Sequence, residues 1–210
     1  MSSHPVFARI YAKTSVAEGH LQEIHRRELT AGLAGRVLEI GCGNGLNFAF
    51  YPPDVTEVVG VEPEPYLRVR AAAAEASVPV TVVAGRAEAV SEAVPGVFDA
   101  VVFSLVLCSV ADPRGVLREA KKVLRDGALV RLYEHVVSED PRVARWQHRG
   151  APLWSRMAGG CRPDRDPVPV FAEEFELTDK RSFDFCPGPR LLLGIVAPHV
   201  LTQGIHRASR

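Results

Sequence analysis

The stretch "RVLEIGCGNGLNF", residues 36–48, decides the fold of this chain. It begins as an apolar run typical of a buried strand, and then Gly41, Gly43 and Gly45 interrupt the run. Glycines at such a turn let a ligand approach the backbone closely. In open α/β sheets ligands bind beyond the carboxyl ends of the strands. The stretch therefore predicts a first parallel strand followed by a ligand site.

Further strands and helices alternate after this turn. Nearly continuous apolar runs cover residues 55–62, 79–85, 98–106 and 128–136, as expected for strands buried on both faces of a parallel sheet. Helices are expected between them, most clearly at 63–77 and at 112–127, where Pro113 opens the helix and Gly127 ends it. Two last strands, within 175–187 and 190–206, suggest an antiparallel hairpin. The pattern predicts a doubly wound, Rossmann-like sheet with helices on both faces.

The flanking segments read as covers of the site. Residues 1–35 look helical, and residues 137–175 are rich in Arg, Pro and Gly and contain both tryptophans. We expect an N-terminal helical cap and, over 137–175, a helix followed by a loop that serves as a substrate lid. With 210 residues the chain is expected to form one domain, 1–210.

Bulk composition excludes several classes of protein. Lys plus Arg equals Asp plus Glu at 25 each, so no basic surplus points to nucleic acid or anionic lipid. The most apolar stretch, 100–110, is much shorter than the roughly 20 residues that span a bilayer, so no integral membrane segment is expected. Four scattered cysteines without a C-x-x-C pair indicate neither a zinc site nor a disulfide framework, and a cytoplasmic location is the default.

The glycine spacing alone leaves two cofactors open. A dinucleotide fingerprint is G-x-G-x-x-G, whereas here the third glycine comes one residue earlier. Both a dinucleotide and S-adenosylmethionine could lie on such a turn. A tight turn without any ligand is the remaining interpretation.

Acidic residues at the strand ends favour the sulfonium cofactor. Glu39 lies within the apolar first strand, where a carboxylate is costly unless it has a partner. It would repel a pyrophosphate and attract the sulfonium and ammonium groups of S-adenosylmethionine. Glu62 ends the second strand and can accept hydrogen bonds from ribose hydroxyls in either cofactor. Glu88 could lie near the adenine, or it could simply favour a helix N-terminus.

Several motifs in order resemble one enzyme family. "VLEIGCGNG", "VVGVEPEPY", "GRAEAV", "FDAVVFSLVLCSVAD" and "VLRDGALVRLYEH" resemble the class I S-adenosylmethionine-dependent methyltransferases over nearly the whole chain. "GNGLNFAFYP", "SLVLCSV", "LYEHV", "WQ", "PLW" and "GGC" resemble, more narrowly, the methyltransferase-like branch that methylates alkyl thiols. The resemblance implies a mostly parallel seven-stranded sheet with a reversed C-terminal hairpin. The chain departs from the family at "RDGA", where "RPGG" is usual, and in the prolines that follow "GGC".

The resemblance also implies a set of cofactor-binding residues, with S-adenosylhomocysteine as the product. The amino acid portion would lie on the glycine turn, the ribose at the second strand, the adenine after the third strand, and the floor at the end of the fourth. The residues are Glu39, Gly41, Cys42, Gly43, Asn44, Gly45, Asn47, Glu62, Pro63, Arg86, Ala87, Glu88, Ser104, Leu105 and Val106. Ser, Leu and Cys stand where catechol-type enzymes carry metal-binding acids, so no metal is expected.

The acceptor would lie beyond the fifth strand. His135 ends that strand and could deprotonate or orient a thiol, or it could be purely structural. The substrate side of the lid would be formed by Trp146, Gln147, Trp154 and Cys161, although the tryptophans could merely pack it. A thiol with a pKa near about 8.5 is partly ionised at neutral pH, so direct in-line displacement needs little base catalysis.

Methylation of a small-molecule thiol is thus the leading hypothesis. N- or O-methylation of another small molecule or a lipid headgroup would suit the same pocket, and a cofactor-binding partner subunit without catalysis is the non-enzymatic alternative. The sequence does not identify the acceptor or the oligomeric state.

Overall fold

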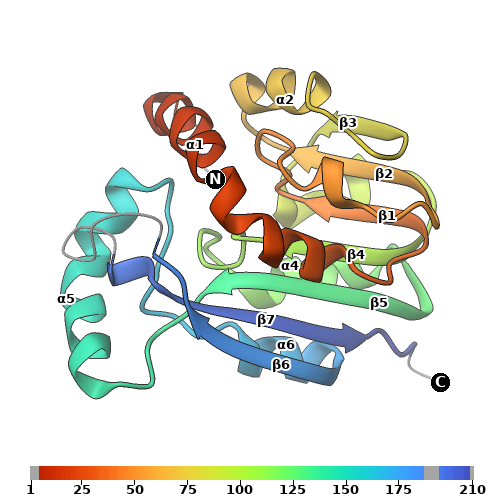
Figure 1. Ribbon diagram of the computed structural model, residues 1–210. Coiled ribbons are helices and arrows are strands. Elements are labelled where there is room, and N and C mark those ends of the chain that lie inside the picture. Colours follow the sequence, from red (N-terminus) through yellow and green to blue (C-terminus); the bar gives the residue numbers. More distant parts are fainter. Residues whose placement is uncertain (1–4, 187–193, 209–210) are drawn as a thin grey trace.

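The computed structural model describes residues 5–186 and 194–208 of the chain. It contains a seven-stranded sheet in the order β3-β2-β1-β4-β5-β7-β6 (Figure 1). The strands are β1 (Gly35–Ile40), β2 (Val55–Glu62), β3 (Val80–Ala84), β4 (Phe98–Ser104), β5 (Leu124–His135), β6 (Glu176–Asp184) and β7 (Pro198–Ile205). The predicted doubly wound sheet is confirmed.

The first five strands are parallel, and the last two form the reversed hairpin that the sequence predicted. β7 pairs antiparallel with β5 and with β6. Residues 190–193 of the predicted last strand, and residue 187 of the strand predicted before it, lie outside the described residues. Chain order reverses beside β1, with β2 on one side and β4 on the other. This switch point places the ends of β1 and β4 together, where α/β sheets bind ligands.

Helices cover both faces of the sheet. The helix α1 (Pro5–Thr30) crosses one face, together with α2 (Pro65–Ala72), while α3 (Val90–Ala93), α4 (Pro113–Lys121) and α6 (Val168–Glu174) lie on the other (Figure 1). The core between them is apolar on both sides, as the continuous runs of β1 and β4 require. Among the described helices, none combines the length and apolar character needed to cross a bilayer.

The predicted helix 112–127 is wrong at its C-terminal end. The α4 helix stops at Lys121, and β5 begins at Leu124. The reason is strand pairing: Phe98 pairs with Leu124, and the Phe98 N–H donates to the Val123 carbonyl at 2.8 Å. Val123 and Leu124 are therefore buried by the sheet and not by a helical stripe. Gly127, with φ of 79°, lies where the pairing of β5 with β4 shifts register, between Leu124 and Leu129.

Of the two predicted cover segments, 1–35 contains the expected helix, whereas 137–175 contains more helix than expected. The N-terminal helix α1 ends at Thr30, and β1 starts at Gly35, the last residue of the predicted cap. The segment 137–175 contains α5 (Pro141–Met157), which stands beyond the edge toward which β1 and β2 point (Figure 1), and also the unexpected α6. Phe171 of α6 is fully buried in the core on the far face of the sheet. That part of the segment packs the core.

Candidate active site

The glycine turn after β1 adopts a backbone that other residues rarely tolerate. Gly41, Gly43 and Gly45 have φ values of 70°, 57° and 80°. A Cβ on Gly41 would lie 2.6 Å from a methyl group of Val106, which follows β4. Glycine at position 41 thus allows the turn after β1 to contact the loop after β4, and both segments line a common cavity.

Glu62 connects the turn to the end of β2. One carboxylate oxygen accepts a hydrogen bond of 2.9 Å from the Gly43 N–H, and the other accepts one of 2.9 Å from the Glu64 N–H. Burial raises the pKa of Glu62, and the two backbone hydrogen bonds oppose that shift. The side chain lines the cavity, and each of its oxygens retains acceptor capacity for a ligand hydroxyl.

Glu39 lies behind the turn and has partners within the protein. Its carboxylate accepts hydrogen bonds of 2.8 Å from the Asn47 amide and 2.7 Å from the Tyr51 hydroxyl. The side chain is only 1% exposed, and this burial raises its pKa to about 7 against the effect of both bonds. Glu39 does not lie among the described residues that line the cavity. Glu39 therefore stabilises the glycine turn through its hydrogen bond with Asn47 and does not face the cavity.

Arg26 of α1 extends this network to the cavity. Its guanidinium donates to the Asn47 side-chain oxygen at 2.6 Å and to Gln22 at 2.8 Å. The side chain is buried and borders the cavity, while its Nε has no hydrogen-bond partner among the described residues. A buried cation at this place suits an anionic group on the ligand.

Glu134, which was not among the residues predicted for the site, organises the loop that follows β4. This fully buried carboxylate accepts backbone hydrogen bonds of 2.6 Å from Val106, 2.6 Å from Leu107 and 3.2 Å from Cys108. Burial raises its pKa to about 7, although these bonds lower it. Leu105, with φ of 59°, begins the loop. The signal was available, because Glu134 is an acid in an apolar strand, as Glu39 is.

Two cysteines meet His135 at the other end of the cavity. Its Nδ1 lies 3.5 Å from the Cys161 sulfur and 3.8 Å from the Cys108 sulfur. The hydrogen bond between the two thiols lowers the pKa of Cys161 and raises that of Cys108. The His199 ring packs 4.6 Å from the His135 ring, and burial lowers the pKa of His199 to about 3.

The cavity has a volume of about 540 Å³, within the range of roughly 300–1,000 Å³ common for small-molecule sites. Of the residues predicted from the sequence, it brings together Gly41, Gly43, Glu62, Pro63, Ala87, Ser104, Leu105, Val106, His135, Trp154 and Cys161. Further lining residues that no sequence motif indicated are Tyr11, Ser15, Gln22, Arg26, Leu67, Cys108, Met157, Phe185 and His199. Most of these residues come from α1, from α5 or from strands distant in sequence, and no local sequence motif predicts that they reach the cavity.

Other predicted residues lie outside the cavity wall. Cys42, Asn44, Gly45 and Asn47 belong to the turn and its support. Arg86 and Glu88 form an ion pair of 3.6 Å beside Ala87, with the Arg86 side chain 55% exposed. Trp146 of α5 is 43% exposed, and its ring lies 3.6 Å from the position of a Cβ on Gly194.

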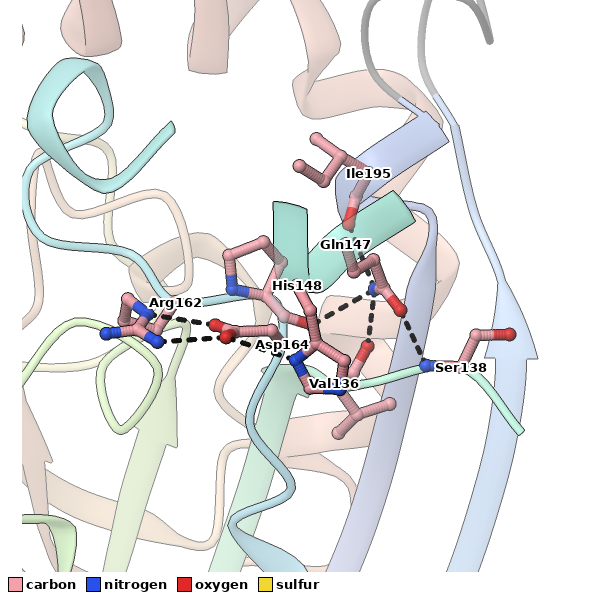
Figure 2. Close-up of polar contacts among 8 residues, drawn as sticks. Val136, Ser138, Gln147, His148, Arg162, Asp164 and Ile195 are labelled. Atoms are coloured by element: carbon pink, nitrogen blue, oxygen red, sulfur yellow. Dashed lines mark hydrogen bonds and ion pairs between the residues drawn. The ribbon is translucent and has the colours of Figure 1, made fainter. Parts of the chain in front are cut away.

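Gln147 is a structural anchor of the α5 segment. It is fully buried, and its Nε2 lies 3.0 Å from the carbonyl oxygens of Val136, Pro163 and Ile195 (Figure 2). Its Oε1 accepts a bond of 2.8 Å from the Ser138 N–H. One side chain thus joins α5 to the end of β5, to the loop before α6 and to the segment before β7. This connection holds Trp154 and Cys161 over the cavity.

Comparison with known proteins places these features in a family. Residues 38–132 match the model of a methyltransferase domain. The human Thiol S-methyltransferase TMT1B is 33% identical over 74% of this chain and 68% of its own length. The chain belongs to the S-adenosylmethionine-dependent methyltransferases. Human Thiol S-methyltransferase TMT1A is 34% identical to this methyltransferase over 65% of the chain and 58% of the relative.

Solved structures agree on the fold. The N-methyltransferase NodS from Bradyrhizobium japonicum WM9, in complex with S-adenosyl-L-homocysteine, superposes with a TM-score of 0.63 at 15% identity, over 90% of this chain and 86% of that one. Identity this low supports the fold alone. S-adenosylmethionine is the cofactor of this methyltransferase. The cavity at the switch point contains the buried Arg26 guanidinium and the Glu62 carboxylate, which fit a ligand that carries both an anionic group and hydroxyls.

Proposed function

We propose that this methyltransferase transfers a methyl group from S-adenosylmethionine to the sulfur of a small-molecule thiol by direct in-line displacement. When bound, the cofactor supplies an electrophilic methyl group. The chain's own residues have to bind the cofactor, orient the acceptor and keep water out. Two relatives that are named thiol S-methyltransferases, at 33% and 34% identity, support the thiol acceptor.

The cofactor half of the cavity is assigned from charge and position. We assign the carboxylate of the methionine portion to Arg26, whose Nε lacks a partner among the described residues, and the ribose hydroxyls to Glu62. The adenine would lie toward Leu67 and Ala87, which offer apolar surface. Glu39, Asn47 and Tyr51 would hold the glycine turn and Arg26 in place through their shared hydrogen bonds.

The observation that carries the thiol assignment is the chemistry of the acceptor half. Among the described residues that line the cavity, Glu62 is the one carboxylate, and it lies at the cofactor end. The acceptor half offers His135, Cys161, Trp154 and Met157, which carry an imidazole, a thiol, an indole and a thioether. An ammonium or a metal-bound catechol would favour a carboxylate there. A thiol does not, because its pKa of about 8.5 makes thiolate available with only an imidazole nearby.

The covers are assigned in the same way. We propose that the chain acts as one domain in which 1–35 caps the cofactor and the early part of 137–175 covers the acceptor. Residues of α1 line the cavity on one side, and Trp154, Met157 and Cys161 line it on the other. A cavity of about 540 Å³ suits a small molecule.

Incubation with labelled S-adenosylmethionine and a panel of acceptors tests the proposal. Alkyl thiols and sulfide should be methylated, while amines, phenols and catechols of similar size should not. Methylation of amines or phenols alone would favour the N- or O-methyltransferase alternative. Cofactor binding without methylation of any acceptor would favour the partner-subunit alternative.

A further inference from the structure

The acceptor end of the cavity holds three groups in the arrangement of a metal site. Cys108 follows β4, His135 ends β5, and Cys161 lies in the loop after α5. Their ligand atoms, the two sulfurs and Nδ1, all lie within 4.8 Å of one another. Three segments distant in sequence thus bring soft ligands to one point, which explains why the cysteine spacing alone gave no sign of a metal site.

The distances match the edges of a tetrahedron around zinc. With Zn–S bonds of about 2.3 Å and Zn–N bonds of about 2.0 Å, tetrahedral geometry separates sulfur from nitrogen by about 3.5 Å. The observed separations from His135 Nδ1 are 3.5 Å to Cys161 and 3.8 Å to Cys108. An ion could enter with shifts of a few tenths of an ångström. Two thiolates and one neutral imidazole also balance the charge of a divalent ion, as a buried site requires.

We propose that Cys108, His135 and Cys161 bind a zinc ion whose fourth coordination position faces the cavity. All three residues line the cavity, so the fourth direction of the tetrahedron is open to a ligand from that space. Three protein ligands and one open position are the pattern of catalytic zinc, whereas structural zinc has four protein ligands. Ser109, 3.5 Å from the Cys108 sulfur, and the His199 ring, 4.6 Å from the His135 ring, surround the ligands.

The open position gives the ion a role in the thiol methylation proposed above, on which this part of the inference rests. An acceptor thiol that takes the fourth position exchanges its S–H bond for a zinc–sulfur bond, and its proton leaves to solvent water. The acceptor is then held as a thiolate at neutral pH. His135 in this arrangement holds the ion, so the imidazole no longer serves as a proton acceptor.

Metal binding is tested without turnover. The purified protein, kept reduced with a phosphine, is titrated with Co²⁺ as a spectroscopic substitute and then with Zn²⁺ in competition. One equivalent should give the visible bands of tetrahedral cobalt and the near-ultraviolet bands of sulfur-to-cobalt charge transfer. Adding an alkyl thiol should then shift these bands, because it enters the open position.

Serine variants locate the site. Cys108→Ser and Cys161→Ser should each lower the affinity for Zn²⁺ by more than about 100-fold, since even changes around the ligands cost about 10- to 100-fold. Cys186→Ser, a cysteine outside the cluster, is the matched control and should bind as the parent does. Calorimetry with S-adenosylhomocysteine reports whether each variant still folds and binds cofactor.

The outcomes separate the two proposals. Absence of stoichiometric binding, or binding that survives in both Cys108→Ser and Cys161→Ser, would overturn the metal site whatever the enzyme methylates. Cobalt bands that do not respond to a thiol would overturn the open position. A protein that binds zinc at these residues and methylates only amines or phenols would retain the metal site and refute the thiol acceptor.

Discussion

The carboxylate of Glu134 accepts a hydrogen bond of 2.6 Å from the backbone N–H of Leu107. The end of β5 thereby fixes the loop after β4, which carries the cavity residues Val106 and Cys108. The same carboxylate also bonds to the N–H groups of these two residues. A buried acceptor with three backbone donors is a strong constraint on the loop, because each unpaired donor would be costly.

Glu134→Gln should destabilise the protein by about 2–3 kcal/mol, because an amide offers one acceptor oxygen and turns an N–H₂ group toward backbone donors. Binding of S-adenosylhomocysteine should weaken as the loop loses its anchor. Chemical denaturation and calorimetry measure the two effects. Glu75→Gln, at an exposed glutamate, is the control and should change neither. Equal stability of Glu134→Gln and the parent would show that the loop does not depend on this carboxylate.

Glu39 should make stability depend on pH. Its pKa is about 7 in the folded protein, against an ordinary value of 4.5, so between these values the folded state holds a proton that the unfolded state has released. The free energy of unfolding therefore falls by about 3 kcal/mol as pH rises from 4.5 to 7, and it changes little above pH 7. Glu134 adds a similar contribution.

Glu39→Gln should flatten this dependence, since glutamine carries no charge to desolvate. Denaturation of both proteins at a series of pH values from 5 to 8 measures the difference. As pH rises, the free energy of unfolding of the variant should increase relative to that of the parent. A parallel pair of curves would mean that the pKa of Glu39 is not raised.

Gly41→Ala should abolish cofactor binding. The added methyl group would lie 2.6 Å from Val106, in addition to the strain of a positive φ. Gly32→Ala is a matched control, because Gly32 has a φ of 69° but no atom within 4 Å of the place that a Cβ would take. The control should lose about 1–2 kcal/mol of stability, because a residue with a Cβ is strained at positive φ, and it should retain cofactor affinity. Calorimetry with S-adenosylhomocysteine distinguishes the two variants, and equal affinities would contradict the close approach of the two loops.

Gln147→Glu should loosen the segment around α5, which we propose covers the acceptor half of the cavity. A carboxylate has no N–H to donate to the carbonyls of Val136, Pro163 and Ile195 (Figure 2), and the buried charge adds a further cost. We expect KM for the acceptor to rise by at least about tenfold, while affinity for the cofactor changes little, because Gln147 does not line the cavity. Arg149→Glu adds a carboxylate on the exposed face of α5 and should leave KM unchanged. If cofactor affinity fell by a larger factor than KM rose, the assignment of the α5 segment to the acceptor would be refuted.

The sequence predicted the parts of this protein that depend on local pattern. Continuous apolar runs marked the parallel strands, and the glycines marked the turn at the switch point. The predicted end of α4 was wrong because Val123 and Leu124 fit the apolar stripe of a helix as well as they fit a strand. Only the pairing of Phe98 with Leu124 shows that the strand begins there. Local periodicity contains no information on that pairing.

The site was predictable to the extent that it rests on motifs. Glu62 and the backbone after β4 line the cavity as expected, because strand ends meet at the switch point. Arg26, His199 and the meeting of Cys108 with Cys161 depend on how α1, β7 and the loop after α5 fold back over the sheet. Gln147, predicted to contact substrate, donates to three backbone carbonyls and does not line the cavity, and only the fold brings those three segments together around it.

The thiol assignment is tested most directly with acceptors that carry two nucleophiles in one molecule. With labelled S-adenosylmethionine, 4-mercaptophenol and 2-aminoethanethiol offer sulfur against oxygen and sulfur against nitrogen at equal size. Mass spectrometry and NMR of the products identify the methylated atom. We expect methyl groups on sulfur alone in both compounds, and methylation of the phenol oxygen or the amine in preference to sulfur would contradict a thiol acceptor.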